Sequence, residues 1–131
     1  MAQIRHLAIR TEDPEKLAAF YIEVFGFKEL HRGSHPGHPP GKSVHLTDGY
    51  FELAILDNSA QDSPNGLYHF GIKIEDMEET LKRFKKFRAD KPIRQRPQGT
   101  PFAEMRVSDL EGNLIDLSVH GFLDYQPLEK K

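Results

Sequence analysis

The sequence predicts an α+β protein in which a single domain is built from two βαβββ modules. Three observations lead to this prediction. A nine-residue stretch near the N-terminus recurs in similar form 63 residues later, an amphipathic helical segment follows each copy, and three short runs typical of strands follow each helix. A chain of 131 residues has the usual length of one domain.

The internal repeat begins with residues 5–13 (RHLAIRTED) and 68–76 (YHFGIKIED). A histidine, an isoleucine followed by a basic residue, and a closing Glu-Asp coincide in the two copies, and each copy is expected to start with a strand. The repeats are expected to cover residues 4–56 and 67–120. Residues 57–66 (DNSAQDSPNG) form a predicted linker, and residues 124–131 a loose tail.

A helix is predicted after each copy. In the first repeat Asp13 is the expected N-cap, Pro14 the first helical residue and Gly26 the end of the helix. In the second repeat Asp76 is the expected N-cap, and Glu79 stands where a capping box needs it. The apolar positions recur with helical spacing and predict the buried stripes: Leu17, Phe20, Tyr21, Val24 and Phe25 in the first helix, and Met77, Leu81, Phe84 and Phe87 in the second.

The strands that follow the helices are short. They are expected at residues 27–32, 43–47 and 50–56 in the first repeat, and at residues 92–96, 102–107 and 114–119 in the second. Asp48 and Gly49 predict a hairpin turn, as do residues 111–113. Residues 33–42 contain three prolines and three glycines, so this segment is expected to be a loop.

Four of the predicted strands share one design. Each has an apolar face, and the opposite face carries one metal-binding residue followed two residues later by a small one. The metal-binding residues are His6, Glu52, His69 and Asp116. Two imidazoles and two carboxylates suit one divalent Zn, Ni, Co, Mn or Fe(II) ion per site better than Ca²⁺.

The composition narrows the chemistry further. The chain has seven histidines and no cysteine. The lack of cysteine excludes disulfides, thiolate metal sites and a cysteine nucleophile. A net charge of -2 and the lack of a long apolar run predict a soluble, cytoplasmic protein without a nucleic-acid or membrane partner. The histidines His31, His35, His38 and His45 are expected to be solvated or incidental, and a substrate-covering lid is the less favoured alternative. Arg94, Arg96 and Arg106 are expected on strands, where they could bind an anion, although nothing else in the sequence supports that role.

Three segments resemble the vicinal oxygen chelate superfamily, which includes glyoxalase I, methylmalonyl-CoA epimerase, fosfomycin-resistance transferases, extradiol dioxygenases and bleomycin-resistance proteins. They are residues 4–9 (IRHLAI), 20–27 (FYIEVFGF) and 109–117 (DLEGNLIDL). The resemblance implies a curved mixed sheet, a half-barrel, around a metal or ligand cavity, and a homodimer. It also implies metal binding by His6, His69 and Asp116, with Glu52 as fourth ligand, although the family usually has glutamate where Asp116 stands.

The activity implied by the resemblance is that of a metal-dependent isomerase or lyase of glyoxalase or epimerase type. It would act on a small chelating carbonyl or carboxylate metabolite through a metal-stabilised enediolate. Glu52 would bind the metal at rest and serve as general base during turnover, a role that requires a raised pKa.

Two alternatives stay open. One is an Fe(II) dioxygenase with a two-histidine, one-carboxylate site. The extradiol pattern is incomplete, because Arg106 stands where those enzymes have a tyrosine, and because no histidine occurs between His69 and His120. The other is a non-catalytic, dimeric ligand-binding or resistance protein. Glu52 favours the isomerase or lyase, because a three-residue iron site leaves that position empty.

Overall fold

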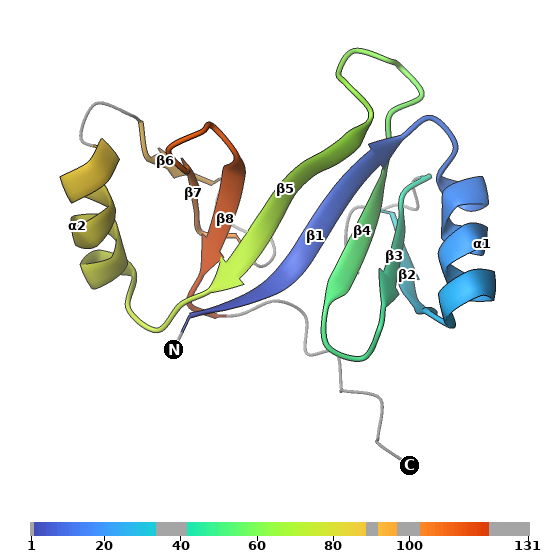
Figure 1. Ribbon diagram of the computed structural model, residues 1–131, viewed down its shortest axis with the longest axis horizontal. Coiled ribbons are helices and arrows are strands. Elements are labelled where there is room, and N and C mark those ends of the chain that lie inside the picture. The colour runs from blue at the N-terminus through green and yellow to red at the C-terminus, as the bar shows by residue number, and fades with distance from the viewer. Residues whose placement is uncertain (1, 34–41, 89–91, 97–102, 121–131) are drawn as a thin grey trace. The chain divides into compact units, whose positions relative to one another are not determined.

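The computed structural model describes residues 2–33, 42–88, 92–96 and 103–120 of the chain (Figure 1). The chain divides into two compact units. We call residues 6–68 the first module, and the described residues from His69 onward, with the start of the chain up to Arg5, the second module. The expected tail at 124–131, His35 and His38 lie outside the described residues, as does most of the expected loop at 33–42.

The order strand, helix, three strands occurs twice, which confirms the predicted α+β class and the βαβββ repeat. The first series is β1 (Gln3–Thr11), α1 (Pro14–Phe25), β2 (Lys28–Arg32), β3 (Val44–Thr47) and β4 (Glu52–Asp57). The second is β5 (Gly66–Lys73), α2 (Met77–Arg88), β6 (Arg94–Gln95), β7 (Met105–Ser108) and β8 (Leu114–Ser118). Within the described ranges neither helix is long and apolar enough to cross a membrane.

Both series pair their strands in the same way. β1 runs parallel to β4, β4 is antiparallel to β3, and β3 is antiparallel to β2. In the second module β5 runs parallel to β8, β8 is antiparallel to β7, and β7 is antiparallel to β6. The connection through a helix allows the parallel pair, and the short turns allow the antiparallel pairs. The sequence repeat is therefore also a repeat of sheet topology.

Helix α1 begins and ends where the sequence predicts. The Asp13 carboxylate accepts the backbone N–H of Lys16 at 3.1 Å, and Pro14 is the first helical residue. Gly26 ends the helix with a φ of 76°, a left-handed conformation that favours glycine, and its N–H donates to the Ile22 carbonyl.

The helix packs on β3 and β4 and completes the first core. The buried residues of this core are Ala18, Val44, Leu46, Leu53 and Ile55. Five partly buried residues pack against them: Leu7, Ile9, Leu17, Tyr21 and Phe27. The prediction that Phe20, Val24 and Phe25 are buried is wrong, since they are 49%, 57% and 60% exposed. Phe20 and Val24 lie roughly 70–110° around the helix from the mean direction of Leu17, Ala18 and Tyr21, which pack into the core. Phe25 is the last helical residue.

Helix α2 is capped by Asp76, whose carboxylate accepts the Glu79 backbone N–H at 3.0 Å. The Glu79 side chain accepts from Arg83 at 3.2 Å instead of turning back to the cap, so only half of the predicted capping box forms. The second core contains Ile74, Val107 and Leu117, and the residues packed against it include Met77, Leu81 and Phe84 from the helix.

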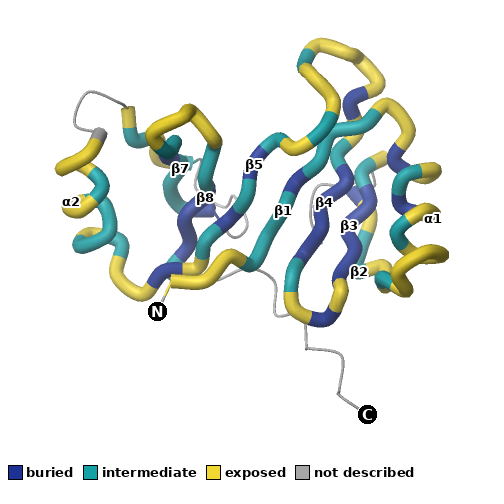
Figure 2. Tube along the Cα trace, viewed as in Figure 1, coloured by how far each residue is buried: buried dark blue, intermediate teal, exposed yellow. Residues whose placement is uncertain are grey.

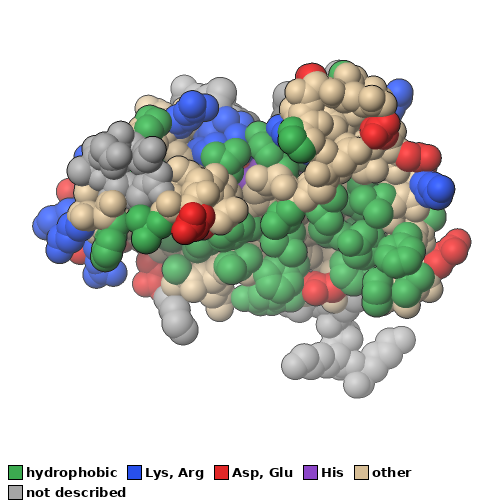
Figure 3. Space-filling view, turned by 45° about the horizontal axis from the view of Figure 1, so that its top comes forward, with side chains coloured by type: hydrophobic (Ala, Val, Ile, Leu, Met, Phe, Trp, Pro, Cys, Tyr) green, Lys and Arg blue, Asp and Glu red, His purple; other side chains and the backbone are tan. Residues whose placement is uncertain are grey.

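The prediction that Phe87 is buried is also wrong, since this side chain is 75% exposed. It lies roughly 90° around the helix from the mean direction of the three buried helix residues, so it points past the sheet. Four basic side chains of α2 are exposed as well: Lys82, Arg83, Lys85 and Lys86. In Figure 3 Lys and Arg side chains gather at the left, and hydrophobic side chains gather over α1 at the right.

The most continuously buried strands are neighbours in the first module. All four residues of β3 and the first four of β4 are buried (Figure 2). The predicted turn between these strands forms, because Asp48 accepts two backbone N–H groups at 2.8 Å and Gly49 adopts a φ of 102°. This hairpin therefore carries its side chains, polar ones included, into a buried environment.

Candidate functional site

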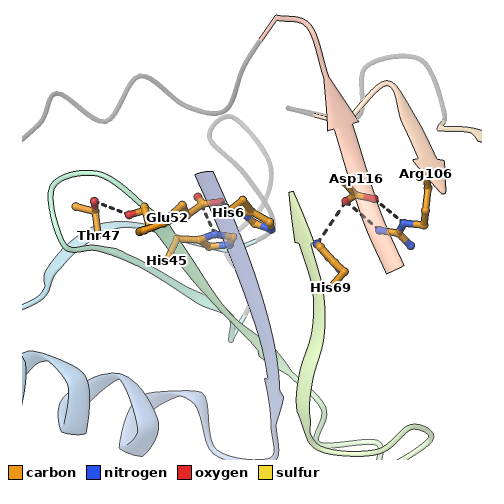
Figure 4. A network of polar contacts seen from close by, with 8 residues as sticks. His6, His45, Thr47, Glu52, His69, Arg106 and Asp116 are labelled. Carbon is orange, nitrogen blue, oxygen red and sulfur yellow. Dashed lines mark hydrogen bonds and ion pairs between the residues drawn. The ribbon is translucent and has the colours of Figure 1, made fainter. Parts of the chain in front are cut away.

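The first module brings together two of the predicted metal-binding residues, His6 and Glu52. They are register partners on the parallel strands β1 and β4, so both side chains leave the same face of the sheet. His6 Nδ1 lies 2.6 Å from Glu52 Oε1 (Figure 4). Glu52 is only 3% exposed. The buried Glu52 and the partly buried His6 therefore form a close pair on the face opposite the apolar core.

His45 joins this pair from β3. Its Nδ1 lies 3.2 Å from Oε2, the second carboxylate oxygen of Glu52, and the residue is 5% exposed. The expectation that His45 is incidental is therefore wrong. The alternation along β3 contained the signal: Val44 and Leu46 belong to the core beneath α1, so His45 points to the opposite face, where Glu52 lies.

The contacts determine which nitrogen of each histidine carries a proton. An ionised carboxylate can only accept hydrogen bonds, so His6 and His45 both donate to Glu52 from Nδ1–H. In a neutral imidazole this leaves the lone pair on Nε2, the nitrogen that can bind a metal or take up a proton. Among the described residues no hydrogen-bond partner reaches the buried Nε2 of His45.

The environment of Glu52 keeps its side chain ionised. Burial raises the pKa of this carboxyl, but the hydrogen bonds and positive charge supplied by His45 and His6 outweigh burial and lower the pKa from 4.5 to about 2. This direction is opposite to the one expected for a general base. The sequence could not show it, because His45 was not among the predicted partners of Glu52.

Thr47 secures the backbone next to Glu52. Its hydroxyl donates to the Phe51 carbonyl at 2.7 Å and accepts the Gly49 N–H at 2.9 Å (Figure 4). Thr47 is also the register partner of Glu52. One buried hydroxyl therefore ties the end of β3 to Gly49 in the turn and to Phe51, the residue just before Glu52, which limits how far the carboxylate can move.

His31 reaches the same region through an irregularity in β2. The β2–β3 register shifts by one residue between Glu29 and His31, and the shift makes His31 the partner of His45. Without it Leu30 would stand opposite His45. The two rings lie 4.1 Å apart between centroids, and donor atoms of His31, His45 and Glu52 all lie within 4.8 Å of one another. The expectation of a solvated His31 is therefore wrong.

The second module brings together the other two predicted metal-binding residues. His69 Nε2 lies 3.4 Å from Asp116 Oδ2, and both residues are buried (Figure 4). On the neighbouring strand Gly71 is the register partner of Asp116, so the face next to this carboxylate carries no bulky side chain. The predicted small residue beside the histidine is therefore in place.

Arg106 is a partner of Asp116 that the sequence analysis did not foresee. It stands opposite Asp116 on β7, with Nε 2.6 Å from Oδ1 and Nη2 3.1 Å from Oδ2. This two-point contact balances the charge of Asp116 and holds its orientation. The sequence placed the two residues on neighbouring strands of a predicted hairpin, but the register that pairs them was not known from the sequence.

The donor set fits a borderline divalent ion. Imidazole nitrogens and carboxylate oxygens converge in each module, and a carboxylate oxygen that accepts one hydrogen bond keeps a lone pair for a metal. The buried Nε2 of His45, which has no hydrogen-bond partner among the described residues, supports the same conclusion for the first module. That His6, Glu52, His69 and Asp116 act together on one ion remains a prediction.

Known proteins share this fold. A methylmalonyl-CoA epimerase solved with methylmalonyl-CoA and NH4+ has a TM-score of 0.66 and 16% identity, covering 98% of this chain and 99% of that chain. A variant of the Streptomyces coelicolor methylmalonyl-CoA epimerase with 2-nitronate-propionyl-CoA has a TM-score of 0.64 and 18% identity, covering 92% and 96%. The Mycobacterium tuberculosis methylmalonyl-CoA epimerase has a TM-score of 0.61 and 15% identity, covering 88% and 85%.

At these identities the solved structures establish the fold alone. A comparison with curated protein sequences gives no match. The sequence profile of one family matches residues 3–117, which is most of the chain and includes both modules. The protein therefore belongs to the Glyoxalase/Bleomycin resistance protein/Dioxygenase superfamily.

Proposed function

We propose that the protein is a divalent-metal-dependent isomerase or lyase of the glyoxalase or epimerase type. Its substrate would be a small metabolite with a chelating carbonyl or carboxylate. The observation that carries the proposal is the buried carboxylate of Glu52, which contacts His6 at 2.6 Å and His45 at 3.2 Å. Buried ionisable groups with a strongly shifted pKa are concentrated at functional sites.

The four residues predicted from the sequence would hold the ion: His6, Glu52, His69 and Asp116. When bound, the ion would supply Lewis-acid stabilisation of the negative charge that develops on two substrate oxygens as the neighbouring proton leaves. The contact between His6 Nδ1 and Glu52 Oε1 would hold the two side chains next to each other where the ion binds. Arg106 would hold Asp116 in one orientation through its two-point contact.

Glu52 would take up the substrate proton at a carboxylate oxygen. With a pKa of about 2 it is a weak base while both histidines donate to it. Burial raises the pKa of Glu52, so the pKa would rise if one histidine turned its Nδ1–H away. A buried carboxylate released from these contacts would approach the pKa range in which general bases work near neutral pH.

The solved structures support the substrate class. Those compared above are methylmalonyl-CoA epimerases, and one contains methylmalonyl-CoA. An epimerase removes a proton from a carbon atom and returns it to the opposite face, which is the chemistry proposed for Glu52. A thioester or carboxylate with an acidic neighbouring C–H is therefore the first substrate class to test.

We further infer a cytoplasmic homodimer without a nucleic-acid or membrane partner. The exposed Phe20, Val24 and Phe25 on α1 support an apolar contact between chains. Figure 3 shows hydrophobic side chains gathered over this helix. The net charge of -2 argues against nucleic-acid binding, and the absence of cysteine suits a reducing compartment. Light scattering after size-exclusion chromatography should give a dimer for the wild type and a monomer for the Phe20→Ser/Phe25→Ser variant.

Proton exchange next to a carbonyl tests the proposed activity. Chelator-stripped protein is reloaded separately with Zn, Ni, Co, Mn or Fe(II) and incubated in D₂O with methylmalonyl-CoA and with small α-hydroxy and α-keto carboxylates. The loss of the α-proton signal is followed by NMR. We expect exchange with at least one ion and a decrease of at least about 100-fold in Glu52→Gln, the usual contribution of a general base.

Glu23→Gln is the matched control, because Glu23 is exposed and belongs to neither polar cluster. A protein that binds none of the five ions, or that binds them without exchange on any substrate, would refute the proposal. Ligand binding that is indifferent to His6→Ala would then indicate a binding protein. Oxygen consumption with catechols would indicate a dioxygenase.

A further inference from the structure

We infer that His31, His45 and Glu52 form a divalent-metal site of their own within the first module. The site shares only Glu52 with the four residues proposed to act in catalysis, and it does not depend on the proposed activity. Its donors come from the neighbouring strands β2, β3 and β4, and all three donor atoms lie within 4.8 Å of one another. Two imidazoles and one carboxylate suit a borderline ion such as Zn²⁺ or Co²⁺.

The strand register brings these residues to one face. His31 is the partner of His45, and His45 is the partner of Ala54, which lies two residues after Glu52 and on the same face. Ala8 is the next partner in this row, so small side chains stand beside His45 on β4 and β1. Across β2, β3, β4 and β1, the two imidazoles therefore lie at one end of this row of paired residues, and the small alanine side chains leave space beside them.

The bulge in β2 is essential to this arrangement. A regular β2–β3 ladder would continue the pairing of Glu29 with Leu46 by placing Leu30 opposite His45. The extra residue moves His31 into that position and places its ring 4.1 Å from the ring of His45. Bulges commonly redirect side chains beside functional sites. Leu30 in this position would supply no metal-binding atom, whereas His31 supplies an imidazole that can bind a metal ion.

The buried atoms have unused binding capacity. His45 is 5% exposed, and among the described residues no hydrogen-bond partner reaches its Nε2. A buried polar atom without a partner destabilises a protein, so most such atoms are satisfied. Glu52 adds a buried negative charge. A divalent ion on the Oε2 side would balance this charge, and His45 Nδ1, which lies 3.2 Å from Oε2, would be within reach of the same ion.

The two oxygens of Glu52 face different histidines. Oε1 contacts His6, whereas Oε2 contacts His45. An ion bound on the Oε2 side with His31 and His45 would therefore leave the contact between Oε1 and His6 in place. This division allows the inferred site to coexist with the four-residue site, with Glu52 common to both.

Cobalt binding to the full chain tests the inference. Metal-free protein is titrated with Co²⁺ and followed by visible absorption, and Zn²⁺ binding is measured by calorimetry. The variants are His31→Gln, His45→Gln and His69→Gln, with His120→Gln as control because His120 is exposed and belongs to neither site. Thermal melts without metal identify any variant that fails to fold. His31→Gln keeps the inference testable if His45→Gln unfolds, because His31 is only half-buried.

We expect His31→Gln and His45→Gln to weaken Co²⁺ binding by at least about tenfold, since even residues that only orient a ligand contribute about 10–100-fold to metal affinity. His69→Gln should still bind one Co²⁺ ion at the site of His31, His45 and Glu52, with the absorption spectrum of that site. His120→Gln should match the wild type. Wild-type affinity and spectrum in both His31→Gln and His45→Gln would overturn the inference. That result would leave the proposed activity untouched if proton exchange persists, so the two failures are distinguishable.

Discussion

His6 and Glu52 stand directly opposite each other on parallel strands, and their Nδ1 and Oε1 atoms lie 2.6 Å apart in a buried environment. The same carboxylate accepts a hydrogen bond from His45 through its other oxygen. Glu52 is therefore held in its charged form between two imidazoles. Among the described residues no hydrogen-bond partner reaches the buried Nε2 of His45. This relationship connects the repeat in the sequence to the chemistry proposed for the protein.

The first prediction concerns acid stability. The pKa of Glu52 falls from 4.5 in the unfolded chain to about 2 in the folded protein, so the unfolded chain takes up the proton first as pH falls. The stabilisation from Glu52 should be complete above pH 4.5 and lost as pH falls towards 2. Its size is on the order of 3 kcal/mol. Urea unfolding of metal-free protein at stepped pH measures it.

Glu52→Gln should lack this part of the acid dependence, because the amide does not titrate. Glu23→Gln, which alters an exposed glutamate, should keep the wild-type profile. The same decline in the unfolding free energy from pH 4.5 to 2 in wild type and Glu52→Gln would contradict the prediction.

The second prediction concerns the pair of Arg106 and Asp116. Asp116 is buried, the Arg106 side chain is only 11% exposed, and the two make a two-point contact, so Arg106→Ala leaves a buried carboxylate without its arginine partner. The unfolding free energy should fall by about 3–5 kcal/mol. The Arg106→Met/Asp116→Leu double variant should be more stable than Arg106→Ala. Chemical denaturation measures both differences.

Arg83 provides a matched control for Arg106. It contacts Glu79 at 3.2 Å on the surface of α2, and its side chain is 74% exposed. Arg83→Ala should change the unfolding free energy by less than about 1 kcal/mol. Equal losses in Arg106→Ala and Arg83→Ala would show that burial does not strengthen the Arg106 contact.

The third prediction concerns the two helix caps. Asp13 and Asp76 are repeat-related, and each accepts a backbone N–H three residues later, at 3.1 and 3.0 Å. Asp13→Ala and Asp76→Ala should each lower the unfolding free energy by about 1 kcal/mol, within a range of about 0.5–2 kcal/mol. Thermal unfolding measures the loss. Serine at either position should restore most of it, and no loss in both alanine variants would refute the capping role.

The fourth prediction concerns the first core. Leu46 is fully buried on the strand that also carries His45, so Leu46→Ala should lower the unfolding free energy by about 2–5 kcal/mol. Leu110→Ala, at a position that is 70% exposed, should change it by less than about 0.5 kcal/mol. Urea denaturation provides the comparison. Similar small effects at both positions would contradict this prediction, because they would mean that the core closes around the space left by the Leu46 side chain.

Much of the fold could be predicted because its signals are local. Caps, glycine-containing turns and alternating apolar residues act within a few neighbouring residues, and Asp13, Gly26 and Gly49 occupy the expected conformations. The width of the buried helix stripe was less predictable, as Phe20 and Phe87 show. Apolar side chains on a helix are buried only where a sheet covers them, and the helical period does not specify the width of that contact.

The candidate site also has a part that follows from local sequence and a part that depends on tertiary contacts. The sequence by itself determined that His6, Glu52, His69 and Asp116 lie on the polar faces of their strands, because strand alternation assigns a face to each residue. Only the tertiary structure decided that His45 and His31 join Glu52, and that Arg106 holds Asp116. These contacts depend on the register between strands, and a bulge of one residue in β2 changes which side chain meets His45.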